Sequence, residues 1–194
     1  IMIVTGGNHA GDFLKLLGNG STFGLKHINY TYQEGEGGIA QALGLTRYFA
    51  DEDKIAVVLG DNILEKSIKP YVEKFKTQES GARIFLKEVP DPERFGVPKI
   101  KGDKIVKVDE KPKHPHSNYA VIGVYFFDNK VFKFIDKLKP SKRGELEIAD
   151  VINFYIHEKE MFYDVIEGWW TDAGTFDSLL RAGNLIADRR GILS

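Results

Sequence analysis

The stretch KIAVVLGDNI, residues 54–63, combines the pattern of a buried strand with an acid at its end. Five apolar residues, Ile55 to Leu59, follow one another without alternation, which is typical of a parallel strand covered on both faces. Gly60 ends the run and Asp61 comes directly after it. In open α/β sheets, ligands bind beyond the carboxyl ends of such strands. The stretch therefore predicts a central parallel strand and a carboxylate that faces a ligand.

Helical and strand-like patterns alternate through the first half of the chain. Ser67 can cap a helix that has Pro70 in its first turn, and glycines end or open the other helical segments. This alternation predicts an α/β fold with a Rossmann-like, doubly wound mixed sheet. Strands are expected over residues 1–4, 27–33, 54–60 and 82–89, and helices over residues 9–20, 37–49 and 68–78.

The alternation changes after Val89. Two short strand-like runs flank Lys101-Gly102-Asp103, a turn sequence, so a β-hairpin is predicted over residues 95–112. We expect this hairpin to form a small annex that closes over one side of the sheet. The remaining patterns predict strands over residues 117–127 and 161–168, and helices over residues 129–138, residues 145–158 and from about Phe176 onward.

Composition excludes several classes of protein. The 194 residues are 42% hydrophobic and 28% charged, as in an ordinary globular domain. The formal net charge of −1 argues against a nucleic-acid partner, and the absence of cysteine excludes disulfides and thiolate metal sites. No apolar run approaches the ~20 residues of a membrane span, and the first residues do not resemble a signal peptide. A cytoplasmic protein without a membrane partner is expected.

A second solitary acid lies near the C-terminus, in WWTDAGT, residues 169–175. Asp172 there precedes Thr175, which can cap the following helix. Together with Asp61 it could hold Mg²⁺, which binds phosphate substrates through only one or two protein carboxylates. The alternative is that both acids are ordinary turn residues. Spacing alone leaves that alternative open.

Six motifs occur in one order: LGDNI at 59–63, DPERFGV at 91–97, DEKP at 109–112, SNYAVIGVYFFDN at 117–129, RGELEIADV at 143–151 and WTDAGTFDSLL at 170–180. Together they resemble the sugar-1-phosphate nucleotidyltransferase family, most closely its members that use dTTP and glucose 1-phosphate. The resemblance extends over essentially the whole chain. It implies that a sugar 1-phosphate attacks the α-phosphorus of dTTP and that pyrophosphate leaves. Positioning and charge stabilisation do most of the work in such transfers.

The resemblance also implies which residues carry the chemistry. Asp61 and Asp172 match the Mg²⁺ ligands of the family, and the metal would neutralise charge on the α-phosphate. Lys111 and Arg143 match residues that bind the phosphate of the sugar, for which the fork of an arginine is well suited. These four residues form the expected catalytic set. The structural alternative for the two basic residues is that they are simply solvated.

Further matches concern substrate binding. Gln33 matches the residue that reads the nucleobase edge, and Gly38 matches a glycine whose backbone lies against the base. Their loop reads EGEGG where the family usually has a proline, and Phe95 stands where many relatives have tyrosine. Structural alternatives are a solvated glutamine, an N-cap glycine and ordinary core packing. The matches to the sugar pocket are Glu110, which would accept hydrogen bonds from hydroxyls, and Phe95, Gly96, Tyr119 and Val121.

The family opens with a strand and a glycine-rich loop that this sequence does not contain. We therefore expect one nucleotidyltransferase domain over residues 1–194 that is N-terminally incomplete. Residues 1–89 would bind the nucleotide and residues 90–194 the sugar phosphate. Two alternatives remain: a uridylyl- or cytidylyltransferase that acts on another hexose 1-phosphate, and a catalytically silent module that binds a sugar nucleotide. Family members are often homo-oligomers, and the same is expected here.

Overall fold

The computed structural model describes residues 1–190 and is built around a mixed six-stranded sheet. Strand β8, Tyr119–Phe127, lies at its centre, and all but the first of its nine residues are buried. A long strand without polar residues is typical of a position covered on both faces. The strand order is β7-β6-β8-β5-β9, and β3 also pairs with β8. The other bounds are β3 Ile55–Val58, β5 Ala82–Glu88, β6 Gly96–Lys101, β7 Lys104–Glu110 and β9 Met161–Val165.

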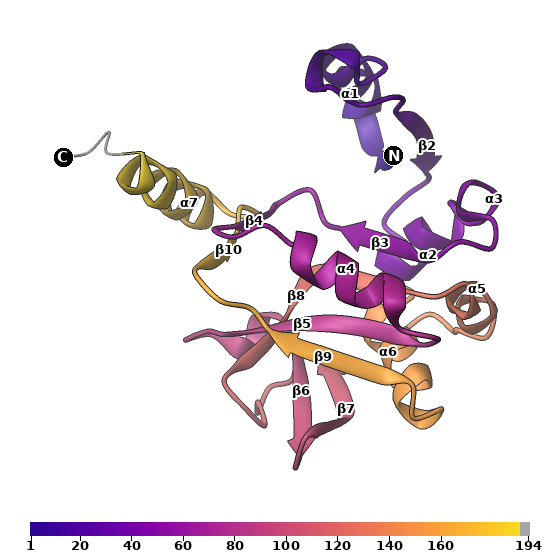
Figure 1. Cartoon of the computed structure of the whole chain (residues 1–194), viewed down its shortest axis with the longest axis vertical. Coiled ribbons are helices and arrows are strands. Elements are labelled where there is room, and N and C mark those ends of the chain that lie inside the picture. The colour runs from indigo at the N-terminus through magenta and orange to yellow at the C-terminus, as the bar shows by residue number, and fades with distance from the viewer. Residues whose placement is uncertain (191–194) are drawn as a thin grey trace.

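Helices cover both faces of this sheet (Figure 1). On one face, Phe75 of α4 packs against Phe85 and Phe126. On the other face, α2, α5 and α6 enclose a larger apolar cluster in which the rings of Phe127 and Tyr155 stack with centroids 5.8 Å apart. Burial of these large side chains is the main force that holds the helices to the sheet. The bounds are α2 Ile39–Gly44, α3 Arg47–Ala50, α4 Lys69–Thr77, α5 Lys130–Ile135 and α6 Ile148–His157.

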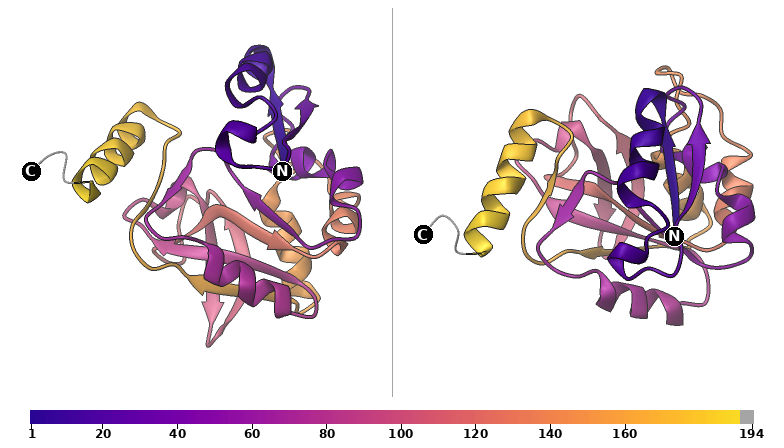
Figure 2. Two further views of the ribbon diagram at one scale, coloured as in Figure 1. Left: turned by 45° about the horizontal axis from the view of Figure 1, so that its top comes forward. Right: turned by 90° about the horizontal axis from the view of Figure 1, so that it is seen from above.

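The N-terminal elements form a unit of their own beside the main sheet (Figures 1 and 2). Strands β1 and β2 pair in parallel as a separate two-stranded sheet, and α1 lies next to them. A cavity of about 1080 Å³ lies between this unit and β3, with Ile1–Thr5 and Lys54–Gly60 in its lining. The elements are β1 Met2–Gly6, η1 Gly7–His9, α1 Ala10–Leu17, η2 Ser21–Phe23 and β2 Asn29–Gln33.

The expected role of β3 as a central parallel strand is wrong. The strand pairs antiparallel with β8, with Ile55 opposite Phe127, and Val58 is 49% exposed. One of its sides borders the cavity beside the N-terminal unit. An uninterrupted β-branched run signals strand, but it carries no information on the direction of the partner.

Two other expectations need correction, although the mixed α/β class is confirmed. The hairpin of β6 and β7 is not a separate annex, because Gly96 pairs with Val121 of β8 and the hairpin extends the main sheet. The helix expected over residues 37–49 is divided into α2 and α3 at Leu45 and Thr46. Thr46 adopts φ −91° and ψ 0°, and this turn redirects the chain.

Helix α7, Phe176–Arg189, begins where the sequence predicted. Thr175 accepts a hydrogen bond from the Ser178 amide, and Ser178 accepts one in return from the Thr175 amide, which makes a reciprocal cap. The helix stands at one side of the molecule, away from the central sheet (Figures 1 and 2). Within residues 1–190, no helix combines the length and the apolar character that a bilayer span requires.

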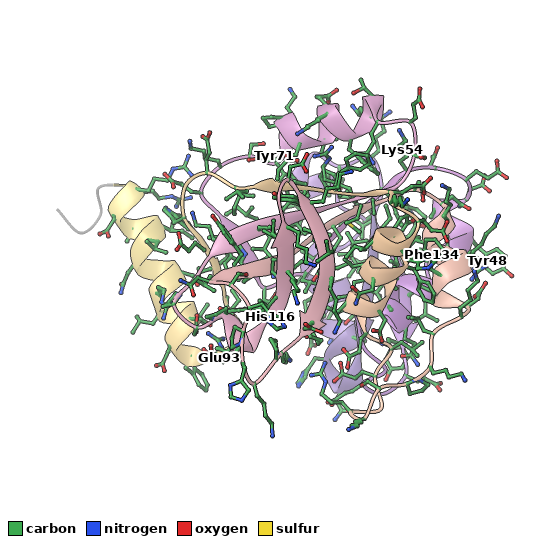
Figure 3. All side chains as sticks on the ribbon, turned by 90° about the horizontal axis from the view of Figure 1, so that it is seen from below. Tyr48, Lys54, Tyr71, Glu93, His116 and Phe134 are labelled. Atoms are coloured by element: carbon green, nitrogen blue, oxygen red, sulfur yellow. The ribbon has the colours of Figure 1, made fainter. Side chains whose placement is uncertain are left out.

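The buried phenol of Tyr155 gives a test of the packing around α6. Its hydroxyl donates to Asp128 Oδ1 at 2.7 Å, and burial followed by this hydrogen bond raises the pKa of Tyr155. Tyr155→Phe removes one partner from a buried carboxylate, so we expect a loss of about 1–2 kcal/mol in unfolding free energy, measured by urea denaturation. Tyr48→Phe is the control, because Tyr48 is 97% exposed and projects from the edge of the molecule (Figure 3). Equal stability of the two variants would contradict the role given to this hydrogen bond.

Candidate active site

Two strands of three residues each bring the solitary aspartates together. Strand β4, Asn62–Leu64, pairs antiparallel with β10, Trp170–Asp172, and Asp172 lies opposite Asn62. The Ala173 amide donates to the Asp61 carbonyl at 2.8 Å and closes this short ladder. Sequence analysis did not predict either strand, because three residues are too few to show a period.

The carboxylates of Asp61 and Asp172 both lie close to Gly174. A Cβ atom built on Gly174 would lie 3.2 Å from Asp61 Oδ2 and 3.6 Å from Asp172 Oδ2. Any larger residue at this position would therefore place its side chain against both acids. Glycine at this position keeps side-chain atoms away from the two anionic oxygens, and both acids line the same cavity.

The side chain of Asn62 connects Asp61 to strands β8 and β10. Its amide nitrogen donates to Asp61 Oδ1 at 2.8 Å, while its Oδ1 accepts from the Gly123 amide and from Trp170 Nε1, both at 2.8 Å. A Cβ atom on Gly123 would lie only 2.4 Å from the Asn62 nitrogen, so the close contact requires glycine. Asn62 is not among the residues predicted from the sequence, although it stands next to Asp61 in the first motif.

The site is a cavity of about 230 Å³ that gathers most of the predicted residues. Strand β10 contributes Asp172 and Trp170, and the Trp170 ring contacts Phe95 at 5.4 Å between centroids. Lys111 follows β7 and has a φ of +43°. Its backbone amide donates a hydrogen bond to the Phe95 carbonyl at 3.0 Å. The predicted residues in its lining are Asp61, Phe95, Gly96, Glu110, Lys111, Val121, Arg143 and Asp172.

Arg143 is oriented by an acid that sequence analysis also missed. Glu147 accepts from Arg143 Nη2 at 2.8 Å and from Arg143 Nε at 3.1 Å, and the Ser141 hydroxyl donates to the same carboxylate at 2.6 Å. Burial alone would raise the pKa of Glu147, but the bonds from Arg143 and Ser141 lower it overall. The acid thus stays charged and presents the guanidinium in one orientation.

Glu110 has the opposite electrostatic environment. Burial raises its pKa above 4.5, and the charge of Glu147 raises it further, while Lys111 and Arg143 act in the other direction. Its nearest basic contact is loose, since Arg143 Nη2 lies 3.9 Å from Glu110 Oε1. The carboxylate therefore keeps acceptor capacity for groups in the cavity.

Arg94 is the third functional candidate that sequence analysis missed. It lies in the short turn η3, Pro92–Arg94, and its side chain lines the cavity. The guanidinium donates to Asp91 Oδ2 at 2.8 Å and to Asp172 Oδ2 at 3.0 Å. The hydrogen bond to Asp91 and the charges of Asp172 and Asp91 raise the pKa of Arg94 against the effect of burial. Arg94 lies within the DPERFGV motif, and its positive charge there is the sequence feature that could have identified it as a candidate.

Gln33 and Gly38 lie in the larger cavity beside the N-terminal unit. Gln33 Nε2 donates to the Gly38 carbonyl at 3.1 Å and to Gln41 Oε1 at 2.7 Å. Gly38 has a φ of +87°, and a Cβ atom there would lie 2.6 Å from the Leu146 carbonyl, so glycine is required for structural reasons. The two cavities share Ile39, Leu59 and Glu145 in their linings.

Tyr119 has a different position from the other predicted residues. It begins β8, is partly buried and packs against the larger apolar cluster. It is not among the described residues that line the smaller cavity. Its contact with a sugar therefore stays a prediction.

The acidic pair fits Mg²⁺ better than a metal that needs a complete protein cage. Within the described residues there is no group of three or more histidine, cysteine, aspartate or glutamate side chains that could hold a metal ion. Mg²⁺ uses one or two carboxylates and takes its remaining ligands from water and substrate phosphates. Asp61 and Asp172 line one cavity and both have an oxygen near Gly174, which suits that mode of binding.

Comparison with known proteins identifies the family of this chain. The family model described as nucleotidyl transferase matches residues 1–189. The glucose-1-phosphate thymidylyltransferase of Neisseria meningitidis is 37% identical over 96% of this chain and 66% of its own length. The low-salt glycan biosynthesis nucleotidyltransferase of Haloferax volcanii is 36% identical over 99% of this chain and 54% of its own. The chain thus spans between about half and two thirds of the length of these curated relatives.

Solved structures show the same relationship. A Bacillus anthracis protein assigned as a glucose-1-phosphate thymidylyltransferase, crystallised with sucrose, superposes with a TM-score of 0.90 and 52% identity, over 95% of this chain and 75% of that one. A UDP-glucose pyrophosphorylase with bound UDP-glucose shares the fold at 20% identity and a TM-score of 0.81, over 97% of this chain and 80% of that one. The resemblance seen in the six motifs is confirmed, and the chain belongs to the nucleotidyl transferase family.

Proposed function

We propose that this chain carries the catalytic site of a sugar-1-phosphate nucleotidyltransferase that transfers a thymidylyl group from dTTP to glucose 1-phosphate. The observation that carries the proposal is the presence of two convergent carboxylates, Asp61 and Asp172, in one cavity with the basic pair Lys111 and Arg143. Two anionic oxygens suit a metal–phosphate complex, and two cations suit a second phosphate. The names of relatives 37% and 52% identical support dTTP and glucose 1-phosphate as the substrates.

In this proposal each half of the cavity has a separate task. Lys111 and Arg143 bind the phosphate of the sugar, and Glu147 keeps the Arg143 fork in place. Glu110 accepts hydrogen bonds from sugar hydroxyls, and Gly96 and Val121 line the same cavity. Gln33 and Gly38 contact the nucleobase from the adjoining cavity, which supports a nucleotide that extends across both.

The reaction then requires alignment more than proton transfer. An oxygen of the sugar phosphate attacks the α-phosphorus of dTTP, a new P–O bond forms, and the bond to pyrophosphate breaks. Mg²⁺ held by Asp61 and Asp172 would supply positive charge to the phosphate oxygens. Asn62 restrains Asp61, and β10 restrains Asp172, so these carboxylates need little reorganisation. Release of pyrophosphate from dTTP with glucose 1-phosphate, compared with a panel of other nucleoside triphosphates and hexose 1-phosphates, tests the substrate assignment.

Substitution of either acid tests the metal role. Asp61→Asn keeps the shape of the side chain but removes its charge, so we expect turnover to fall about tenfold or more, a barrier increase above ~1.4 kcal/mol. Asp136→Asn is the matched control, because Asp136 forms its ion pair with Arg47 outside the cavity lining. The rate of pyrophosphate release at saturating Mg²⁺ is compared between the two variants. An Asp61→Asn enzyme with turnover close to that of Asp136→Asn would show that Asp61 does not serve the metal.

Removal of the basic side chains tests the sugar-phosphate site. Lys111→Ala and Arg143→Ala should each raise the KM for glucose 1-phosphate more than the KM for dTTP, because each loses a charge-assisted contact worth ~1.5–3 kcal/mol. Lys113→Ala removes an exposed lysine of the same loop and should leave both KM values unchanged. Steady-state kinetics with each substrate varied in turn gives the comparison. Equal increases for both substrates would count against the assignment.

The raised pKa of Glu110 predicts a pH effect on sugar binding. A carboxyl with a raised pKa becomes protonated at a higher pH than an ordinary glutamate, so its acceptor capacity is lost as the pH falls toward 4.5. The KM for glucose 1-phosphate should therefore increase as the pH is lowered. Glu110→Gln removes this titration but leaves that of the substrate phosphate, whose second pKa is about 6. Identical pH profiles of the two enzymes would exclude Glu110 as the titrating group.

A further inference from the structure

Arg94 forms a hydrogen bond with a carboxylate oxygen of Asp172, one of the two proposed metal ligands. Its Nη2 donates to Asp172 Oδ2 at 3.0 Å. The same Oδ2 lies near Gly174, as does Asp61 Oδ2, at 3.6 Å and 3.2 Å from a Cβ atom built on that glycine. The side chain of Asp172 is only 16% exposed, so this guanidinium is a substantial part of its surroundings. A cation of the protein itself therefore lies at the edge of the proposed metal site.

Arg94 has other partners that do not depend on Asp172. It donates to Asp91 Oδ2 at 2.8 Å, and its guanidinium carbon lies 5.1 Å from the centre of the Phe95 ring. Its side chain is 37% exposed, which leaves open volume around it. The guanidinium can thus release Asp172 and still keep one ion pair and one aromatic contact.

The positive charge of Arg94 has opposite effects on the acidic pair and on an incoming metal ion. Two carboxylates that face one space repel each other, and a nearby cation relieves that repulsion. The same positive charge opposes entry of a divalent cation, because like charges at short range raise each other's energy. Arg94 thus stabilises the acidic pair when no metal is present, and it weakens binding of a free metal ion.

We propose that Arg94 is a resident counter-ion of Asp172, which a divalent cation has to displace before it can bind; this inference rests on the proposed metal role of Asp61 and Asp172. In this role the arginine acts through Asp172 and is not itself a ligand of the metal. Displacement to Asp91 accompanies loading of the site. If Arg94 only oriented Asp172 for the metal, its removal would weaken metal binding, so the two roles predict changes of opposite sign.

Mn²⁺ binding without substrates shows directly whether removal of Arg94 raises or lowers the affinity for metal. Electron paramagnetic resonance of free Mn²⁺, titrated with the protein, should show about tenfold tighter binding for Arg94→Gln than for the parent, equal to ~1.4 kcal/mol. Arg94→Lys keeps the charge and should stay close to the parent. Arg47→Gln is the matched control, because Arg47 also pairs with an aspartate, Asp136, and lies over the ring of Phe132. It should leave Mn²⁺ affinity unchanged.

The outcomes separate this inference from the proposed metal site. Binding by Arg94→Gln that is equal to or weaker than that of the parent overturns the counter-ion role, and so does an Arg94→Lys variant as tight as Arg94→Gln. Adding Asp172→Asn to Arg94→Gln should abolish the tighter binding. Tight Mn²⁺ binding that survives Asp172→Asn would instead overturn the metal site itself. Circular dichroism of each variant confirms that the comparison concerns folded protein.

Discussion

The pairing of β4 with β10 is the contact on which the site depends. Three residues on each side make this ladder, and without it Asp61 and Asp172 would be on unconnected loops. A ladder this short is weak by itself, so its stability comes from its surroundings. The Asn62 amide joins it to Gly123 in the buried central strand and to the Trp170 indole. The Asn62 side chain thus fixes Asp61 and β10 to the central strand of the sheet.

The central strand β8 contributes to the site in three ways. Val121 lines the cavity, Gly123 accepts the close approach of Asn62, and Tyr125 borders the same space from a buried position. Burial raises the pKa of Tyr125 well above its ordinary value, with smaller contributions from Glu110 and Asp61, so its phenol stays neutral. Functional residues on a strand packed on both faces have little freedom to move, which favours a preorganised site.

Acidic side chains outnumber basic ones in the lining of the cavity, five to three. Acidic side chains line it together with Arg94, Lys111 and Arg143. Each of the two arginines is paired with a cavity acid, Arg94 with Asp172 and Arg143 with Glu147. In the free protein these pairs limit the repulsion between acids at a cost to the affinity for anions and metals. In the proposed reaction, substrates that bring both phosphate and metal would satisfy both sets of partners at once.

The sequence by itself determined the class of the fold and identified most of the predicted residues that line the smaller cavity. The apolar runs and the Thr175 cap depend on neighbours in the chain, which is why β8, α4 and the start of α7 were predicted correctly. The motifs identified the candidate acidic and basic residues, because the type of a side chain limits which ligands it can bind. Only the tertiary structure decided the antiparallel direction of β3 and the meeting of Asp61 with Asp172, since strand pairing joins residues far apart in sequence. The same holds for Asn62, Arg94 and Glu147, whose importance comes from what each side chain contacts in space.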